Sequence, residues 1–171
     1  MPLIVEDGSV VPNADSFVSL ADARTLADQY GWEMPADDTE AEQALRNGAQ
    51  YVDLQEPRFS GSRVSIDQTL SWPRTGSTNT FGFDIPDDSI PSQVICGQVA
   101  AAVEYGAGTD VRASSDGKNI ASEEVVGAVK QSFFNNGKSD STVEITKALD
   151  CLKPVMNGSS GGAYSFNVVR C

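Results

Sequence analysis

The sequence predicts a mainly α protein, a small bundle of about four helices with a β-hairpin or extended arm and an extended C-terminal tail. Three observations support this fold class. Apolar residues recur at helical spacing in several stretches. Glycine or proline stands where these stretches end. The stretch 94–105 is apolar or small at almost every position, which is typical of a buried helix at the centre of a bundle.

The first two helices are predicted by their caps and by one apolar face each. Ser19 is an N-cap and Gly31 a C-terminal stop, so we expect a helix over 20–30. Its apolar face consists of Leu20, Ala23, Ala27 and Tyr30. Asp38 begins the second helix, and Pro57 stops it because proline cannot donate a backbone hydrogen bond. Small residues on one face predict that another helix packs closely against it. That face consists of Ala41, Ala44, Leu45, Gly48 and Val52.

The third and fourth helices follow a long loop, 76–88, which is rich in Gly, Ser, Thr and Asn. We expect three apolar residues to anchor this loop. They are Phe81, Phe83 and Ile85. Pro91 stands near the first position of the third helix, which ends at 106–108. A capping box at 141–144 begins the fourth helix, and Pro154 ends it. Its apolar stripe consists of Ile145, Ala148, Leu149 and Leu152.

Residues 120–134 favour a β-hairpin, or a pair of extended arms that break near Gly127. A helix through 121–134 is the rival interpretation, and the sequence leaves it open. The candidate interface residues in this segment are Val125, Val126, Val129, Phe133 and Phe134.

The C-terminal residues are predicted to be an arm. Residues 158–162 form a flexible Gly/Ser linker, and the tail 163–171 alternates and is rich in β-forming residues. The chain therefore divides into a helical domain, 1–157, and a linker with a docking arm, 158–171. The arm either docks on a partner's sheet edge or folds back onto the hairpin of its own chain. Its candidate interface residues are Tyr164, Phe166, Val168 and Val169.

Net charge is the strongest global feature of this sequence. There are 24 acidic residues, 12 basic residues and no histidine, which gives a net charge of −12 at pH 7. The absence of histidine excludes Ser-His-Asp, Cys-His and histidine metal sites. A surface this acidic repels phosphate backbones, whose neutralisation supplies most non-specific nucleic-acid affinity. The acidity either keeps the protein soluble or forms a functional surface, and both interpretations remain open.

The three cysteines predict free thiols rather than a disulfide framework. Cys96 lies in the apolar third helix, Cys151 in the fourth helix and Cys171 at the last position, and three is an odd number. We therefore expect a protein made in a reducing compartment. No apolar run approaches the roughly 20 residues of a membrane span, and the residues after Met1 show no secretory signal.

The segment 50–76 has the most informative sequence. Three arginines and two aromatic residues stand there with little predicted regular structure. They are Arg58, Arg63, Arg74, Phe59 and Trp72. Such residues can form a platform on which single-stranded nucleic acid stacks. Alternatively, the arginines pair with acids while the tryptophan fills the core. We favour the second interpretation, because three arginines in so acidic a chain make a small site. It predicts that Trp72 packs against the helix at 94–105 and that Arg74 pairs with an acid.

Adjacent acids occur at three places, Asp37-Asp38, Asp87-Asp88 and Glu123-Glu124. Such pairs stand at helix starts and loop edges far more often than at metal or acid–base sites. The sequence also has no Gly-rich phosphate-binding loop with a lysine. We therefore predict no enzymatic activity, no cofactor and no metal.

The segment 50–76, together with residues 4–8 and 12–20, resembles a family of small tailed-bacteriophage proteins. The resemblance covers roughly residues 4–130. Its most specific part is the spacing Arg-x-x-x-x-Gln-x-Leu-x-Trp-Pro-Arg, which begins at Arg63. The motif residues are Arg58, Phe59, Gly61, Arg63, Gln68, Leu70, Trp72, Pro73 and Arg74, with Tyr51 and Leu54 before them.

Members of this family look like head-to-tail adaptors, or connectors, and are often labelled DnaT-like single-stranded-DNA-binding proteins. The resemblance to adaptors implies a dodecameric ring in the neck of the virion, made in the bacterial cytoplasm. This ring would bind the portal and a tail or nozzle/stopper protein, with no membrane involved. Double-stranded DNA would pass through it without sequence-specific binding, which an acidic lining favours. The family label implies the alternative, a single-stranded-DNA-binding replication protein, which needs a positive surface. We predict the adaptor.

Overall fold

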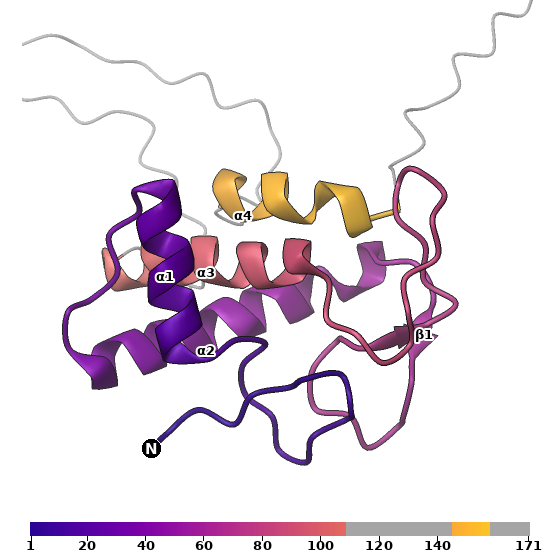
Figure 1. Cartoon of the computed structure of the whole chain (residues 1–171), viewed down its shortest axis with the longest axis horizontal. Coiled ribbons are helices and arrows are strands. Elements are labelled where there is room, and N and C mark those ends of the chain that lie inside the picture. Colours follow the sequence, from indigo (N-terminus) through magenta and orange to yellow (C-terminus); the bar gives the residue numbers. More distant parts are fainter. Residues whose placement is uncertain (109–144, 158–171) are drawn as a thin grey trace, which may run out of the picture. The chain divides into compact units, whose positions relative to one another are not determined.

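The computed structural model describes residues 1–108 and 145–157. Within these ranges the protein has four α-helices and one two-stranded antiparallel sheet, which confirms the predicted mainly α class (Figure 1). The elements are α1 (Leu20–Tyr30), α2 (Asp38–Leu54), the 3-10 helix η1 (Glu56–Arg58), β1 (Ser62–Arg63), β2 (Arg74–Thr75), α3 (Ser92–Gly106), α4 (Thr146–Leu152) and the 3-10 helix η2 (Lys153–Val155). Among these helices, none has the length and apolar character that crossing a membrane requires. The predicted hairpin at 120–134 and the predicted arm at 158–171 lie outside the described residues.

The ends of α1 and α2 follow local sequence signals. The hydroxyl of Ser19 accepts a hydrogen bond from the backbone N–H of Asp22, and Gly31 ends α1 in the left-handed conformation with a φ of 66°. The carboxylate of Asp37 caps α2 by accepting from two backbone N–H groups of its first turn. The pair Asp37-Asp38 is therefore a helix start. An acid at this position also interacts favourably with the helix dipole.

Helix α3 packs against both α2 and α4 (Figure 1). At Gly48 the backbones of α2 and α3 approach each other closely. A Cβ atom at this position would collide with the backbone carbonyl of Gln98 and crowd Ala102. The small residues of α2 therefore admit a second helix, as their spacing predicts.

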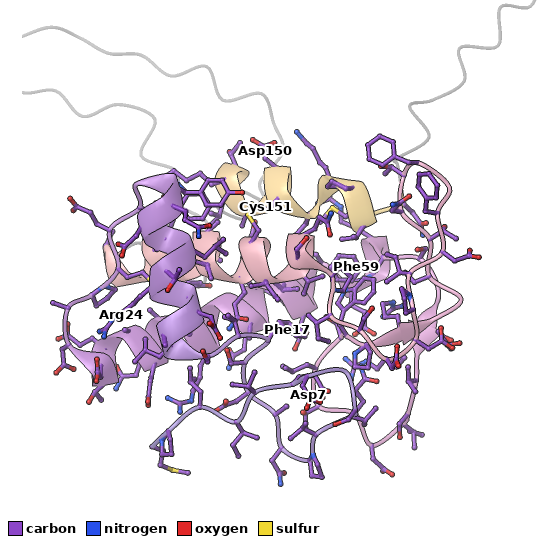
Figure 2. All side chains as sticks on the ribbon, viewed as in Figure 1. Asp7, Phe17, Arg24, Phe59, Asp150 and Cys151 are labelled. Carbon is purple, nitrogen blue, oxygen red and sulfur yellow. A yellow bond between two sulfur atoms is a disulfide. The ribbon has the colours of Figure 1, made fainter. Side chains whose placement is uncertain are left out.

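Gln98 connects α3 to the N-terminal segment. Its side chain is fully buried. The amide nitrogen Nε2 donates to the backbone carbonyl of Leu45 at 2.9 Å and to the hydroxyl of Ser16 at 2.7 Å. The amide oxygen Oε1 accepts from the backbone N–H of Phe17 at 2.9 Å. Because these hydrogen bonds satisfy the buried amide of Gln98, they fix the position of the segment that contains Phe17. The side chain of Phe17 points into the interior (Figure 2).

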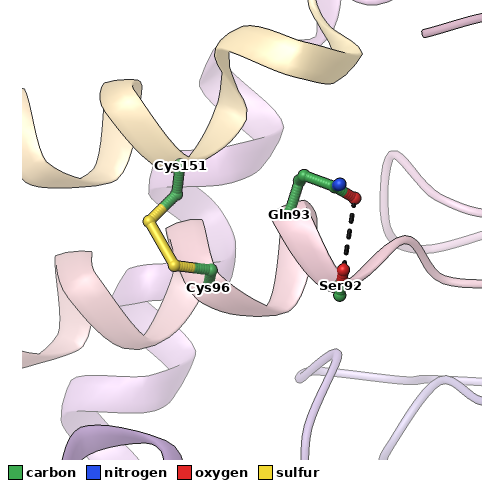
Figure 3. The surroundings of a disulfide bond; sticks show 4 residues. All are labelled: Ser92, Gln93, Cys96 and Cys151. Atoms are coloured by element: carbon green, nitrogen blue, oxygen red, sulfur yellow. Dashed lines mark hydrogen bonds between the residues drawn. A yellow bond between two sulfur atoms is a disulfide. The ribbon is translucent and has the colours of Figure 1, made fainter. Parts of the chain in front are cut away.

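Cys96 of α3 and Cys151 of α4 form a disulfide (Figure 3). The prediction of free thiols is therefore wrong for these two residues, and Cys171 lies outside the described residues. The two cysteines are 55 positions apart, so their unlike sequence contexts gave no indication that α3 and α4 lie side by side. Gly97 permits this close packing, because a Cβ atom there would collide with the side chain of Leu152.

Helix α4 is shorter at its start than the sequence predicts. It begins at Thr146, after the buried residue Ile145, which makes no side-chain cap. The predicted capping box at 141–144 lies outside the described residues. Beyond Leu152 the chain continues as η2, which has Pro154 in its first turn, where proline is tolerated.

The loop between β2 and α3 differs from its prediction. Ile85 is half-buried against the core, but Phe81 and Phe83 are 76% and 70% exposed. The prediction that these two phenylalanines anchor the loop is wrong. Backbone hydrogen bonds hold the loop instead, for example from the N–H of Ile85 to the carbonyl of Ser77 at 2.9 Å.

Candidate functional site

The residues of the predicted motif meet where η1, β1 and β2 come together. We call this cluster the Trp72 corner. It consists of the side chains Glu56, Phe59, Arg63, Gln68, Trp72 and Arg74. Register in the short sheet pairs Ser62 with Thr75 and Arg63 with Arg74, which brings the two arginines onto neighbouring strands. The sequence predicted little regular structure here, because strands of two residues are too short to show a period.

Trp72 is the apolar centre of the corner. Its side chain is 0% exposed and shares a core cluster with Val52 of α2, Val94 of α3 and Leu152 of α4. The ring of Phe59 meets it edge to face, with centroids 5.7 Å apart. Figure 2 shows Phe59 pointing into the interior. The prediction that Trp72 packs against the third helix is confirmed.

Gln68 holds the segment around Trp72 in place. Its amide nitrogen donates to the backbone carbonyls of Leu70 at 2.8 Å and Pro73 at 2.9 Å. Its amide oxygen accepts from the backbone N–H of Val64 at 3.2 Å. The glutamine is itself buried, so these bonds satisfy carbonyls that water reaches poorly. The role of Gln68 in the motif is therefore structural.

The guanidinium of Arg74 is bonded inside the fold. It donates to the backbone carbonyls of Ser60 at 2.8 Å, Gly61 at 2.7 Å and Ser71 at 3.2 Å. It also donates to the carboxylate of Glu56 at 3.0 Å, which confirms the prediction that Arg74 pairs with an acid. These four hydrogen bonds use most of the five N–H donors of the guanidinium, so few donors remain for a ligand.

Arg63 approaches the same carboxylate from β1. Its Nε and Nη2 atoms donate to the two oxygens of Glu56 at 2.8 and 2.6 Å, and Nη1 donates to the backbone carbonyl of Gln68 at 2.8 Å. The hydrogen bond from Arg63 lowers the pKa of Glu56, although partial burial acts in the opposite direction. Glu56 therefore pairs with both arginines, and its lowered pKa favours the carboxylate form.

Asp53 is the second acid of this region. Its Oδ1 atom accepts from the backbone N–H of Ser71 at 2.8 Å. Burial raises the pKa of Asp53, because the charged carboxylate is poorly solvated there. The sequence did not identify Asp53 or Glu56 as partners of this corner. An acid near the end of a helix can face solvent or a later loop, and the residues around it look the same in both cases.

Most of the residues proposed for the stacking platform are not free to stack with a nucleic acid. Phe59 and Trp72 are buried, and Arg63 and Arg74 are bonded to Glu56. Of the motif's basic and aromatic side chains, Arg58 alone is exposed, and it donates to the amide oxygen of Gln55 at 3.1 Å. One exposed arginine gives a nucleic acid little to bind.

Acidic residues dominate the described part of the chain. Eighteen of the 24 acidic residues lie in 1–108 and 145–157, against seven of the 12 basic residues. Six of those seven bases form ion pairs with acids. The acids in excess therefore set the sign of the potential around this part of the protein. In the same ranges no three His, Cys, Asp or Glu side chains are placed to hold a metal ion.

The other predicted interface residues lie outside the described residues. They are Val125, Val126, Val129, Phe133, Phe134, Tyr164, Phe166, Val168 and Val169.

The fold and the Trp72 corner define a small, mainly α protein in which a tryptophan, two arginines and one glutamate hold a loop segment against the central helix. Over residues 1–171 the sequence matches the family described as "Putative DnaT-like ssDNA binding protein", and the chain belongs to this family. A search of curated proteins and a search of solved structures each gave no match. The family description names the alternative that the sequence left open, and it does not name an adaptor.

Proposed function

We propose that this protein is a structural component of a tailed-bacteriophage virion, a head-to-tail adaptor whose ring joins the portal to the tail. One observation carries the proposal: among the described residues, the tryptophan and two of the three arginines of the motif are buried or bonded within the fold. Trp72 has no exposed surface, and the guanidinium groups of Arg63 and Arg74 are bonded to Glu56 and to backbone carbonyls. A DNA-binding protein needs such groups free at its surface.

The charge distribution supports the same proposal. Acids outnumber bases by eleven among the described residues, so a DNA phosphate that approaches them is repelled. Repulsion is useful in a ring through which DNA passes, because the duplex does not adhere to the wall. The resemblance to adaptors implies a dodecamer with the portal on one side and a tail or nozzle/stopper protein on the other. The role is structural rather than enzymatic, and it requires no cofactor.

Electron microscopy of the purified chain, combined with mass spectrometry of the virions that carry it, tests this proposal. We expect cyclic rings in the images and a copy number in the virion that matches the portal. A chain that is absent from purified virions, or present only in replication complexes of infected cells, would overturn it.

The second candidate function is single-stranded DNA binding in replication. The description of the family to which the chain belongs supports this candidate and not the adaptor. Five of the 12 basic residues lie in 109–144 and 158–171, so any DNA-binding surface would depend on those two segments. This candidate predicts that the protein forms a 1:1 or cooperative complex with single-stranded oligonucleotides, and that added salt lowers the affinity of this complex.

A further inference from the structure

Two phenylalanines project into solvent from the loop between β2 and α3. Phe81 is 76% exposed and Phe83 is 70% exposed. We call this pair the Phe knob. Burial of one aromatic ring removes about 150–250 Å² from water, and such rings are common at the centres of docking surfaces. The Phe knob is therefore a candidate docking surface.

The loop that carries the Phe knob has a fixed backbone. The side-chain oxygen of Asn79 accepts from the backbone N–H groups of Phe81 and Phe83, each at 3.0 Å. The N–H of Asn79 donates to the carbonyl of Phe83 at 2.9 Å. A loop held by its own hydrogen bonds loses little conformational entropy when another segment docks on it, so the knob is prepared for binding.

The last described residue lies close to this loop. The N–H of Thr80, the residue before the knob, donates to the carbonyl of Pro154 in η2 at 2.8 Å, and Figure 1 shows the end of α4 beside the loop. Asn157 is the last residue described, and its N–H donates to the carbonyl of Arg58 at 2.6 Å. The residues that follow Asn157 therefore start from a point near the Phe knob.

The following segment is long enough to reach the knob. Asn157 comes three residues after Pro154, and a chain advances at most about 3.6 Å per residue, which places Asn157 within about 20 Å of Phe81. Tyr164 comes seven residues after Asn157, so it reaches up to about 25 Å from that point. The tail, residues 163–171, is therefore within reach of the knob of its own chain.

The sequence of the tail has an apolar side that suits the Phe knob. In an extended segment every second side chain faces the same way. Tyr164, Phe166 and Val168 would then lie on one side, with Ser165 and Asn167 on the other. A single strand of this length is not stable alone, so its apolar side needs a surface on which to dock.

Charge also favours the tail as the segment that covers the knob. The loop around the knob carries three exposed acids, Asp84, Asp87 and Asp88. Residues 158–171 contain no acid and one base, Arg170, which falls on the same side of an extended tail as Phe166. Residues 109–144 contain six acids and four bases, so the acids of the loop repel that segment on balance. Of these two segments, the tail is the one that the loop attracts.

We propose that the tail docks on the Phe knob of its own chain, with Tyr164 and Phe166 against the two phenylalanine rings and Arg170 facing the acids of the loop. The tether of residues 158–162 keeps the tail at a high effective concentration near the knob, so a weak contact is sufficient. The docked tail makes the aromatic pair unavailable to other proteins. This contact goes beyond the adaptor function and does not depend on it.

Electron paramagnetic resonance of a nitroxide label on Cys171 tests the contact in the full chain. Cys96 and Cys151 are bonded to each other, so Cys171 is the thiol that takes the label. A docked tail slows the motion of this label and gives a slow component in the spectrum. The tail variant is the double substitution Tyr164→Ser and Phe166→Ser. We expect its equilibrium constant for docking to be at least about tenfold smaller than that of the parent.

The opposite side of the tail provides the matched control. Ser165→Ala with Asn167→Ala changes two tail residues that face away from the knob, so the slow component should stay as it is in the parent. The knob variant, Phe81→Ser with Phe83→Ser, should lose the slow component as the tail variant does. Equal label motion in the parent and in the tail variant would overturn the inference. The tail substitutions lie outside the described fold, so this result does not depend on how well the knob variant folds.

A mixture of two variants separates docking within one chain from docking on a second copy. The labelled knob variant has an intact tail, and the unlabelled tail variant has an intact knob. We expect the label to move as fast in the mixture as in the knob variant alone, because the labelled tail docks only on the altered knob of its own chain. A slow component that appears on mixing would show that the tail docks on a second copy, and it would overturn the inference.

Discussion

The guanidinium of Arg74 donates to the carboxylate of Glu56 at 3.0 Å, and the arginine side chain is only 6% exposed. If this guanidinium turned outward to hold a phosphate, it would leave three backbone carbonyls unpaired in the fold, and Glu56 would keep only Arg63 as its ion-pair partner. The conspicuous arginines and tryptophan of the motif therefore stabilise a corner of the protein. The contributions of this corner and of the packing around α3 can be measured directly.

Truncation of the Trp72 side chain should destabilise the protein strongly. The ring is fully buried among residues of α2, α3 and α4, so Trp72→Ala leaves a large cavity and should lower the free energy of unfolding by about 3–5 kcal/mol. Urea denaturation measures this loss. The control Ile66→Ala removes an exposed side chain and should stay within about 0.5 kcal/mol of the parent. A Trp72→Ala protein with the parent's midpoint would show that the corner is not part of the core.

Glu56→Gln should destabilise the protein and make its free energy of unfolding depend less on pH in the acidic range. Loss of the carboxylate leaves two arginines unpaired, but Arg74 keeps its carbonyl partners, so we expect a loss of about 2–3 kcal/mol at pH 7. The pKa of Glu56 is lowered from its ordinary value of 4.5. Its stabilisation is therefore present above pH 4.5 and is lost as the pH falls through the lowered value. When the free energy of unfolding is measured from pH 6 downward, it should fall more steeply for the parent than for Glu56→Gln. Equal slopes of stability against pH for the two proteins would contradict the pairing of Glu56 with the arginines.

Asp53→Asn should have the opposite pH dependence. Burial raises the pKa of Asp53 above 3.8, so ionisation of this carboxyl costs stability as the pH rises beyond that value. The asparagine side chain keeps an oxygen for the N–H of Ser71 and removes the charge. Relative to the parent, the variant should gain stability between pH 3 and pH 7. A variant that loses stability over this range would show that the carboxylate is better solvated than its burial indicates.

Gly48→Ala should destabilise the contact between α2 and α3. Alanine is intrinsically better in a helix by about 1 kcal/mol, but overpacking against the backbone of Gln98 costs about 1–3 kcal/mol or more, because backbone atoms cannot move aside easily. Because the clash is with backbone, we expect the upper part of this range, a net loss of about 2 kcal/mol in urea denaturation. Gln43→Ala is the matched control, since Gln43 is an exposed residue of the same helix. A more stable Gly48→Ala protein would mean that the helices can separate at no cost.

The protein with a reduced disulfide should be less stable than the oxidised protein. The bond between Cys96 and Cys151 closes a loop of 55 residues, for which the loss of unfolded-state entropy corresponds to about 4 kcal/mol. Thermal unfolding with and without dithiothreitol measures the difference. Cys96→Ser is the control, because it should have the lower stability in both conditions and no response to the reductant. A parent that melts identically in both conditions would contradict the pairing.

Features with a local cause could be predicted from the sequence. The caps Ser19 and Gly31 act within one turn of α1, so their residue types were sufficient. The close approach at Gly48 was also predictable, because small residues at helical spacing leave room on one face for the backbone of a second helix. The burial of Trp72 was predictable because a segment with little regular structure keeps its shape only when so large a ring packs against the core.

Features that depend on distance in space could not be predicted in the same way. The partner of Cys96 is 55 positions away, and only the packing of α3 on α4 brings the sulfur atoms together. The identity of the acid that pairs with Arg74 depends on the turn at η1. Phe81 and Phe83 looked like loop anchors, because the sequence does not show that Asn79 and backbone hydrogen bonds fix the loop without them.

The structural role of the motif and the repulsive charge of the protein are tested most directly by one binding measurement. Fluorescence anisotropy of a labelled single-stranded oligonucleotide, titrated with the full chain at low salt, compares the two candidate functions. We predict no saturable rise, because the arginines of the Trp72 corner are bonded internally and acids exceed bases around them. Saturable binding whose affinity falls steeply as salt is added would contradict the account and would favour the single-stranded-DNA-binding function.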